Sequence, residues 1–581
     1  MQTNVPRPEY PRPQFVREPW VNLNGTWTYT FDFGKSGKER GLAESQGFGD
    51  PISVPFCPES KLSGVEHKDF IEMMWYHRKL SIPGSWGGKA IVLHFGAVDY
   101  ESEVFIDGKS VGRHWGGTVS FAYDITPFVK PGVTHDLVVW VHDDTRSGSQ
   151  PGGKQCPTFD SRGCHYTRTT GIWQTVWMEA VSPYGLKDVT SVPDLDGSRF
   201  VFTPRFYALK PGLRLRVTLK AGATLVGQVE TVAANGVPCV LPIHSPRPWS
   251  PEDPFLYDVS YEVLDGPVVI DSVSSYAGLR KVHIEGNQIY LNNAPIFLRL
   301  VLDQGFYPEG IWTAPSDEAL KHDIELSMQA GFNGARLHQK VFEERFHYWA
   351  DRLGYLSWGE SSSWGIDVKD VVSARAFLAE WREIVARDRN HPSIIAWTPF
   401  NETHDVGDGH QHNRLHRDAA QLTRDLDPTR PVNDASGYVH VDTDIWTVHT
   451  YQQDIDLLRD QLAPKPESGV YRNFPDREAD YAGQPYIVDE FGGIKWIPRA
   501  ELVYAENSWG YGEGPKTLDE FYTRLEGMVD VLLGFEHITG FCYTQLTDVE
   551  QEQNGVYNYD RTEKFDMGQI KRIFSKARPR G

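Results

Sequence analysis

The sequence predicts two β-sandwich domains followed by a C-terminal (β/α)8 TIM barrel. The chain has 581 residues, which is more than one hydrophobic core usually supports. Residues before about 282 show the apolar–polar alternation of β-strands. After that point strand-like and helix-like segments alternate, as in a parallel sheet with crossover helices. We therefore expect domains at residues 1–183, 184–281 and 282–581.

The two sandwiches are predicted from short alternating segments and a hairpin signal. WVNLNGTWTYTFDF alternates apolar and polar residues, and in VFIDGKSVG Asp107 and Gly108 separate two strand-like runs. An Asp-Gly pair favours the positive φ angles of a tight hairpin turn. RLRVTLKAG, ATLVGQVETV and FLYDVSYEVL follow, and a domain of about 100 residues with such strands fits an immunoglobulin-like sandwich.

The barrel is predicted from about eight βα units. Ser316 can cap a helix in which Leu320, Ile324 and Met328 recur every fourth residue before Gly331 ends it. The strands end in polar or aromatic residues, which is typical of a barrel with a site at one rim. The predicted strands are IFLRLVL, NGARLH, YLSWGE, IIAWTPFNE, DIWTVHTY, PYIVDEFGG and ITGFCYTQLTD.

The amino-acid composition limits the kinds of molecule that the protein can bind. A formal net charge of −20 without dense basic clusters disfavours nucleic acid, which requires a basic surface. No apolar run approaches the roughly 18 residues of a membrane span, and the N-terminus lacks a signal-peptide pattern. We expect a soluble, cytoplasmic protein that binds neither nucleic acid nor membrane. The 18 tryptophans slightly favour a carbohydrate partner, because aromatic faces pack against sugar rings.

The five cysteines, Cys57, Cys156, Cys164, Cys239 and Cys542, show no CxxC spacing. A zinc site or a disulfide scaffold is therefore not indicated. Cys156 and Cys164 are close enough in sequence to pair, but free thiols are expected in a reducing cytoplasm. No clustered set of ligands indicates a metal, and we predict that neither a metal nor another cofactor is needed for chemistry.

Two glutamates occupy the same position relative to different strands. Glu402 follows IIAWTPFN and Glu490 follows PYIVD. In a closed barrel both would project from one rim, and paired carboxylates across a cleft are what glycosidic bond cleavage requires. The alternative for each is a solvated carboxylate at the rim. Asn401 beside Glu402 could bind a sugar hydroxyl. The apolar sequence before each glutamate also predicts a raised carboxyl pKa.

Seven motifs along the chain resemble those of glycoside hydrolase family 2, which includes β-galactosidases, β-glucuronidases and β-mannosidases. The resemblance covers nearly the whole chain and implies a jelly-roll sugar-binding domain, an immunoglobulin-like domain and a catalytic barrel. The motifs are LNGTW at 23–27, VFIDGKSVGRHWGG at 104–117, TGIWQTVW at 170–177, WSPEDPFLY at 249–257, RDRNHPSIIAW at 387–397, NE at 401–402 and VDEFGG at 488–493.

This resemblance implies roles for individual residues. Glu402 falls on the acid/base position and Glu490 on the nucleophile position, with retention of configuration. Asn401 would contact the sugar 2-hydroxyl, and Tyr451 resembles the tyrosine that the family places beside its nucleophile. The family's first domain sends a loop toward the active site, so the glycine-rich segment 146–170 is expected to do so, with Asp160 and His165 as candidate substrate contacts.

Departures from the family pattern concern the substrate. Arg336 and His338 stand where relatives have Arg-x-x-His-Tyr-Pro, and LDQGFYPEG lacks the usual His-Glu or His-Asp pair, so Asp303 and Gln304 are candidates for those sugar contacts. QEQNGVYNYDR, after the last strand, lacks the Asn-x-Lys motif by which glucuronidases bind the substrate carboxylate. Because an unpaired buried carboxylate is costly, a neutral sugar is favoured.

Several residues allow two interpretations. Arg336 and His338 could bind substrate or only hold rim carboxylates. Trp358 and Trp364 could belong to the core or to the wall of a sugar subsite. Glu360 is more typical of a structural partner for Arg or His than of a third catalyst.

The sequence therefore predicts a retaining exo-β-glycosidase, with a β-galactosidase as the first choice. An α-L-arabinofuranosidase or β-D-galactofuranosidase is the next alternative, and a β-glucuronidase follows it. From another class, a non-catalytic carbohydrate-binding protein with a degenerate barrel remains open, although the presence of both glutamates disfavours it. A homo-oligomer is allowed, and the sequence leaves the sugar and linkage open.

Overall fold

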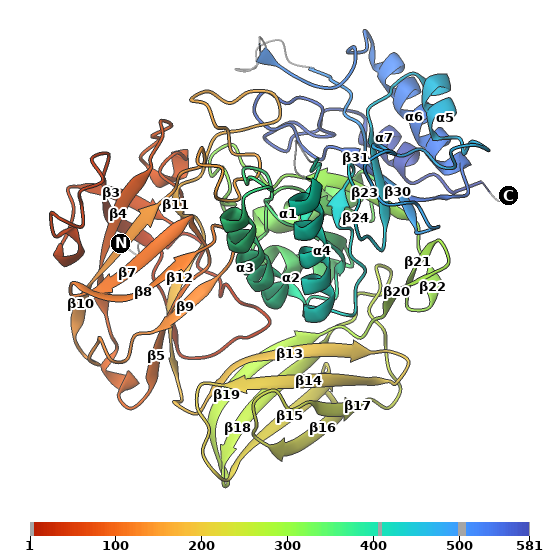
Figure 1. The fold of residues 1–581 in the computed structure, drawn as a ribbon. Coiled ribbons are helices and arrows are strands. Elements are labelled where there is room, and N and C mark those ends of the chain that lie inside the picture. The colour runs from red at the N-terminus through yellow and green to blue at the C-terminus, as the bar shows by residue number, and fades with distance from the viewer. Residues whose placement is uncertain (1–4, 405–408, 498–506, 580–581) are drawn as a thin grey trace.

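The structure is a computed structural model that describes residues 5–404, 409–497 and 507–579. Three bodies follow one another along the chain; in Figure 1 the first sandwich lies to the left of the barrel and the second lies below it. The predicted architecture is confirmed. In the part of the chain that is described, no helix combines the length and apolar character needed to span a membrane, and all five cysteines are free thiols.

The first sandwich consists of two antiparallel sheets that enclose an apolar core. Asp107 (φ 47°) and Gly108 (φ 77°) form the predicted hairpin turn between β7 and β8. One sheet has the order β1 (Trp20–Asn22), β12 (Val176–Val181), β5 (Ala90–Phe95), β9 (Phe121–Asp124). The other has the order β3 (Asp50–Val54), β2 (Gly25–Phe31), β4 (Met73–Ser81), β10 (Thr134–His142), β7 (Glu101–Ile106), β8 (Lys109–Trp115), and a small pair joins β6 (Val98–Asp99) to β11 (Gly171–Ile172).

The second sandwich packs a three-stranded sheet on a four-stranded one. The first has the order β13 (Leu186–Asp194), β14 (Arg199–Phe206), β17 (Cys239–Pro242); the second has the order β16 (Thr224–Val232), β15 (Leu213–Ala221), β18 (Tyr257–Asp265), β19 (Val268–Ala277). A small antiparallel sheet then leads into the barrel and contains β20 (Val282–Glu285), β21 (Gln288–Leu291) and β22 (Ala294–Pro295).

Seven parallel strands form most of the barrel wall, and a two-stranded parallel pair fills the remaining gap. The sheet has the order β26 (Ile394–Thr398), β25 (Leu356–Glu360), β24 (Gly334–Leu337), β23 (Leu298–Asp303), β31 (Ile538–Thr544), β30 (Tyr486–Gly492), β29 (Trp446–Thr450). The pair is β27 (Phe400–Asn401), which continues β26, and β28 (Ala435–Ser436). Gly437 N donates to Thr447 Oγ1 at 2.9 Å and connects this pair to β29.

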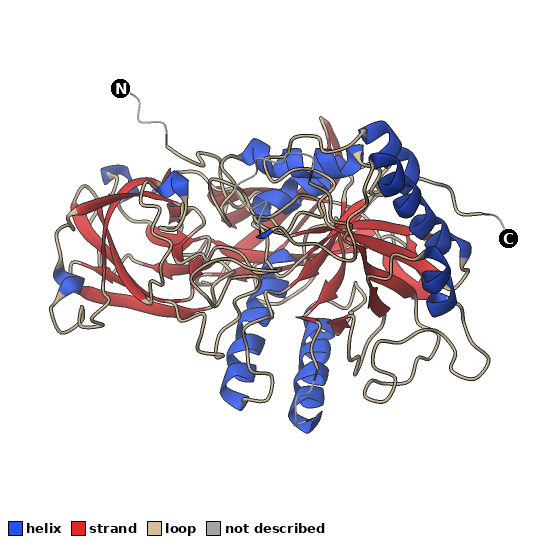
Figure 2. Cartoon of the chain, turned by 90° about the horizontal axis from the view of Figure 1, so that it is seen from above, coloured by secondary structure: helices blue, strands red, loops and turns tan. Residues whose placement is uncertain are grey.

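Helices cover the outside of the barrel (Figure 2). Ser316 caps the first helix as predicted, and its Oγ accepts from Ala319 N at 3.2 Å. No helix separates β28 from β29, because the nine or so residues between them are fewer than a helical crossover requires. The helices are α1 (Asp317–Gln329), α2 (Glu344–Leu353), α3 (Val371–Asp388), α4 (Gly409–Leu426), α5 (Ile455–Leu462), α6 (Leu518–Gly534) and α7 (Met567–Phe574).

Candidate active site

Polar side chains from several strands meet at the carboxyl-terminal rim of the barrel. Glu360 is the last residue of β25 and Asn401 the last of β27, while His449 and Glu490 lie near the ends of β29 and β30. Because the strands are parallel, these ends share one rim. Barrel enzymes place their chemistry at this rim.

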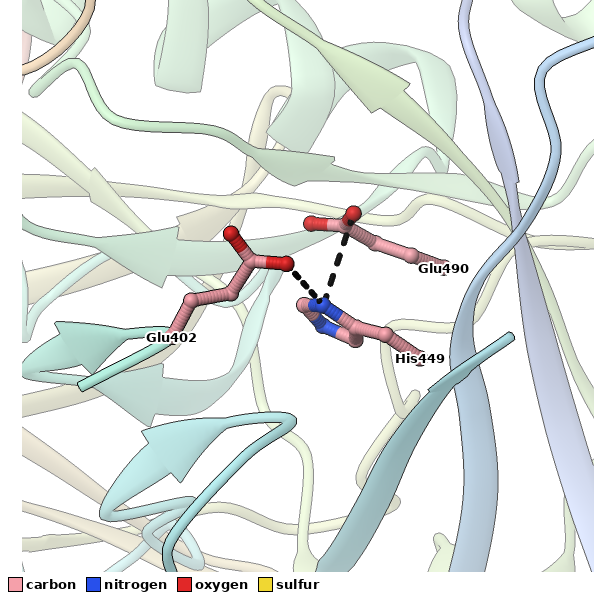
Figure 3. Close-up of side chains that lie close together, drawn as sticks. All are labelled: Glu402, His449 and Glu490. Carbon is pink, nitrogen blue, oxygen red and sulfur yellow. Dashed lines mark hydrogen bonds and ion pairs between the residues drawn. The ribbon is translucent and has the colours of Figure 1, made fainter. Parts of the chain in front are cut away.

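Glu402 and Glu490 face each other, with His449 beside both carboxylates (Figure 3). His449 Nδ1 lies 2.7 Å from Glu402 Oε1 and 3.5 Å from Glu490 Oε2. One oxygen from each glutamate and one imidazole nitrogen all lie within 4.8 Å of one another. The two acids therefore flank a space that one reacting atom could occupy.

The charge of His449 follows from its neighbours. Burial disfavours the imidazolium, but the carboxylates of Glu490 and Asp489 outweigh it and raise the pKa of His449 to about 10. Its second nitrogen, Nε2, lies 3.3 Å from Asp489 Oδ1 and 3.1 Å from Ser436 Oγ. His449 is consequently a cation at neutral pH, hydrogen-bonded on both sides of its ring.

The ionisation of Glu402 differs from the sequence prediction. Burial raises its pKa, as predicted, but the hydrogen bond and the positive charge of His449, followed by the charges of Lys154 and Arg336, lower it below the usual value. The prediction of a raised pKa is wrong for the substrate-free protein, because it considered the apolar strand and not the cations across the rim. Glu402 also adopts φ 49°, a left-handed conformation that is uncommon outside glycine and concentrates at functional sites.

Glu490 is held by two side chains that the sequence singled out. Arg336 Nη2 donates to Glu490 Oε1 at 2.5 Å, and Tyr451 Oη donates to Glu490 Oε2. The Tyr451 ring stacks on Tyr511 with centroids 3.3 Å apart. These contacts fix both carboxylate oxygens, and one of them lies against a permanent cation.

Arg336 is the centre of a buried ionic network. Its Nη1 lies 3.3 Å from Asp489 Oδ2, and its Nε lies 3.5 Å from Glu360 Oε2. His338 Nδ1 lies 2.8 Å from Arg336 Nη2 and 3.0 Å from Glu360 Oε1. Burial, together with the charges of Lys154 and Arg336, keeps the pKa of His338 well below its usual range. Glu360 thus has the structural contacts expected of it.

Asn401 lies within this network and keeps one polar group available. Its Oδ1 lies 3.4 Å from Arg336 Nη1, whereas its buried Nδ2 has no hydrogen-bond partner among the described residues. A buried amide donor without a partner is costly. It is therefore suited to a ligand oxygen, which agrees with the predicted contact to a sugar hydroxyl.

The glycine-rich loop of the first sandwich reaches this rim. Gly152 N donates to Trp364 O at 2.6 Å, and Gly153 N donates to Ser362 O at 3.2 Å. The His165 ring lies 5.3 Å from the ring of Trp364, which is half-buried and donates through Nε1 to Asn401 O at 3.1 Å. His165 and Trp364 therefore form a wall beside Glu402.

Four further candidates lie away from the two glutamates. Trp358 is 0% exposed, packs in the barrel core and donates to Thr398 Oγ1 at 2.5 Å, so the structure favours its core interpretation. Gln304 Nε2 donates to Tyr166 Oη and to Gln545 Oε1, each at 2.6 Å. Asp303 accepts from the backbone of the following loop. Asp160 is exposed on the first-domain loop.

An open hollow of about 560 Å³ adjoins the site. It begins at His449 and Tyr451 and continues over residues after β29 and on α5. Pockets that hold small ligands have volumes of several hundred Å³, but neither Glu402 nor Glu490 lines this hollow, so it borders the site on the side of β29 and α5 and does not contain the two acids.

Sequence reasoning did not single out His449 or Lys154. A signal for His449 was present, because residues two apart on a strand share one face, and Tyr451 lies two residues beyond it. Lys154 is buried in the loop beside Trp364, with Nζ 4.1 Å from the ring centroid. No local pattern distinguishes it from the other polar residues of that loop.

Within the described ranges, one group of side chains has the spacing of metal ligands, and it consists of Glu402, His449 and Glu490. His449 Nδ1 already contacts Glu402 at hydrogen-bond distance, so a metal there would have to displace that proton. Without a metal, the three groups can carry protons and supply a nucleophile, and the prediction that no metal is needed stays a prediction.

Comparisons with known families and proteins agree with this architecture. Family models described as "Glycosyl hydrolases family 2, sugar binding domain", "Glycosyl hydrolases family 2" and "Glycosyl hydrolases family 2, TIM barrel domain" match residues 41–150, 210–280 and 282–494, which is more than half of the chain. The fold and these three family matches together identify the protein as a glycoside hydrolase. The chain belongs to glycoside hydrolase family 2.

Individual relatives carry two kinds of name. A β-glucuronidase of Paenibacillus borealis is 24% identical over 96% of both chains. A β-galactosidase of Thermoanaerobacter pseudethanolicus is 24% identical over 71% of this chain and 55% of its own length. The solved β-glucuronidase of Ruminococcus gnavus with D-glucuronic acid superposes with a TM-score of 0.81 at 21% identity, covering 98% of this chain and 100% of that one. This last likeness shows the shared fold.

Proposed function

We propose that the protein is a retaining exo-β-glycosidase in which Glu490 is the nucleophile and Glu402 the acid/base. The observation that carries this proposal is the proximity of the two acids, whose nearest ligand oxygens lie within 4.8 Å of each other. Retaining glycosidases hold their carboxyl groups about 5–5.5 Å apart, whereas inverting enzymes leave about 6.5–9.5 Å for a water molecule.

In the first step, the Glu490 carboxylate attacks the anomeric carbon as Glu402 protonates the departing oxygen. The bond from C1 to that oxygen breaks, and an ester between the sugar and Glu490 forms. Arg336 and Tyr451 orient the nucleophile through its two oxygens. In the second step, Glu402 removes a proton from water, which attacks C1 and releases the sugar and the Glu490 carboxylate.

Proton supply follows from the contact between His449 and Glu402. The lowered pKa of Glu402 keeps its carboxyl group ionised in the free protein, so this group does not carry the proton itself. The proton that His449 Nδ1 donates to Glu402 Oε1 can instead pass through Glu402 to the leaving oxygen. His449 is therefore proposed as a positioning residue that sets the proton balance of the acid/base.

Two sugars are candidates for the substrate. The sequence favours a β-galactoside, because no lysine occupies the family's carboxylate-binding position. A β-glucuronide is the second candidate. It is supported by the printed names of relatives and by a buried lysine that the first domain contributes to the rim.

The assignment is tested with Glu490→Gln and Glu402→Gln on a panel of aryl β-glycosides. We expect Glu490→Gln to lose at least about 1,000-fold in kcat, because the covalent step needs an anion. Glu402→Gln should lose about 100- to 10,000-fold on poor leaving groups, and added azide should partly restore turnover on an activated one. Glu309→Gln, at an exposed site, is the control. Near-normal activity of either active-site variant would eliminate the assignment.

A further inference from the structure

Lys154 is a buried lysine without a carboxylate partner. It is only 6% exposed. Its Nζ lies 4.1 Å from the centre of the Trp364 ring, and no carboxylate in the described part of the chain comes within ion-pair distance of it, whereas the neighbouring acids Glu550 and Glu552 accept hydrogen bonds from the loop itself. Burying an unpaired cation is expensive, and the Trp364 ring offsets only part of that cost.

The position of Lys154 is fixed by the backbone on both sides. Gly152 and Gly153 are hydrogen-bonded to the barrel loop that carries Trp364, and Lys154 O accepts from Tyr166 N at 2.8 Å. Trp364 in turn donates to the carbonyl of Asn401, the residue before Glu402. Lys154 therefore lies on the wall of the site, beside the acid/base.

Nearby acids keep Lys154 charged. Burial lowers its pKa, but the surrounding groups Cys164, Glu552, Glu490 and Glu402 together raise it above the usual value. Lys154 in turn lowers the pKa of Glu402. Neither glutamate forms an ion pair with Lys154, so their mutual influence acts over more than ion-pair distance.

Other cations of the barrel rim are already engaged. Arg561 lies 3.0 Å from Asp323, and Lys564 lies 2.7 Å from Asp548. Lys340 donates to two backbone carbonyls, those of Gly305 and Trp312. These side chains hold the loops after the first, second and last strands, and none of them is free to neutralise a substrate.

We propose that Lys154 is the specificity-determining cation of the site and pairs with the carboxylate of a terminal uronic acid. This inference rests on the proposed function and identifies the sugar class. A hydroxymethyl group would leave the buried charge without a counter-ion, whereas a carboxylate supplies the partner that the chain itself lacks. The cation comes from the first sandwich and takes the place of the Asn-x-Lys lysine that residues 551–561 lack.

The test compares Lys154→Met and Lys154→Arg with the wild type on substrates that differ only at C6. Two pairs of substrates are used. The first is nitrophenyl β-D-glucuronide and nitrophenyl β-D-glucoside, and the second is nitrophenyl β-D-galacturonide and nitrophenyl β-D-galactoside. We expect the wild type to favour one uronide over its neutral partner. Lys154→Met should lower kcat/KM for that uronide by about 100-fold or more and change the neutral sugar by less than about threefold. Lys154→Arg should keep most of the preference, because the charge remains.

Lys109→Met, an exposed lysine on β8, is the matched control and should leave both rates unchanged. An equal loss on acidic and neutral sugars in Lys154→Met would show a structural role and overturn the inference. The inference would also be overturned if the wild type cleaves only neutral sugars and Lys154→Met has the same ratio of kcat/KM on uronides to kcat/KM on neutral sugars. The proposed function would still stand.

If the wild type cleaves neither pair, the proposed function is decided by the wider panel of aryl β-glycosides, and binding decides the inference separately. Free glucuronate and galacturonate should raise the melting temperature of the wild type and of Lys109→Met more than glucose and galactose do. Lys154→Met should lose this difference. Equal shifts in all three proteins would reject a carboxylate site at Lys154.

Discussion

His449 lies against both proposed catalytic acids, and its charge is coupled to that of Glu402. The imidazolium donates to Glu402 at 2.7 Å and lies 3.5 Å from Glu490. Its positive charge lowers the pKa of Glu402 and is itself stabilised by Glu490 and Asp489. Groups coupled in this way titrate together, and removal of one shifts the others.

Replacement of His449 by Asn should therefore change the pH profile. His449 and Glu402 must together hold the transferable proton in the first step, so loss of that proton limits kcat/KM on the basic side. Neighbouring carboxylates raise the pKa of His449 to about 10. Without the imidazole the proton must rest on Glu402 alone, and we expect the basic limb of kcat/KM to move to lower pH as the maximal rate falls. The measurement is a pH–rate profile on an aryl glycoside from pH 4 to 10.

His440→Asn is the matched control for this measurement. His440 is another buried histidine, and it pairs with Asp434 at 2.8 Å. Its replacement should leave the basic limb where it is. If the limb of His449→Asn stays in place or moves to higher pH, the proposed role of His449 in proton supply is wrong.

At the scale of strands and loops, the sequence allowed part of the site to be predicted. Glu402 and Glu490 could be found because each ends an apolar strand, and parallel strands bring their ends to one rim. Strand β28 could not be predicted, because its two residues, Ala435 and Ser436, are too few to show the apolar–polar alternation of a strand. His449 lies two residues before Tyr451, at the end of a predicted strand, and was open to prediction. Lys154 depends on how a loop of one domain packs on another.

The first-domain loop depends on Gly153 for its approach to the barrel. Gly153 has φ +56°, and a Cβ there would lie 2.2 Å from Gln339 O, a contact with backbone that must shift. Gly153→Ala should therefore displace the adjacent Lys154 and lower kcat/KM by about tenfold or more, since a 1 Å displacement can cost about 100-fold.

Gly148→Ala is the matched control in the same loop. Gly148 also has a positive φ, +71°, but a Cβ there meets nothing within 4 Å. It should retain kcat/KM to within about threefold, because only the local conformational cost is added. Equal kinetics of the two variants would contradict a functional role for the close approach of the loop.

At the scale of the whole molecule, a buried ionic contact fixes the position of the two sandwiches relative to each other. Arg17 is 2% exposed and lies 3.1 Å from Glu179 of the first sandwich and 2.9 Å from Asp271 of the second. The first sandwich must keep its position, because its loop forms part of the site wall. The order and class of the domains follow from sequence periodicity, whereas their contacts involve residues far apart in the chain and have no local signal.

Arg17→Met should destabilise the protein by about 3–5 kcal/mol, because it leaves two buried carboxylates without a counter-ion. The expected result is a clear fall in the urea concentration at the midpoint of the first unfolding transition. Arg205→Met is the control, since Arg205 pairs with Asp188 but is 62% exposed, and an exposed pair contributes about 0–1 kcal/mol. Similar losses in both variants would contradict the proposed role of the domain contact.

The central claim, that Glu490 forms a covalent bond to the sugar, is tested most directly by trapping that species. A 2-deoxy-2-fluoro aryl glycoside with a good leaving group, in the sugar series that the wild type cleaves, should inactivate the enzyme. Mass spectrometry of peptides should then place one fluorosugar on Glu490. A label on Glu402 or on another residue, or turnover of the trap with inverted configuration, would contradict the account.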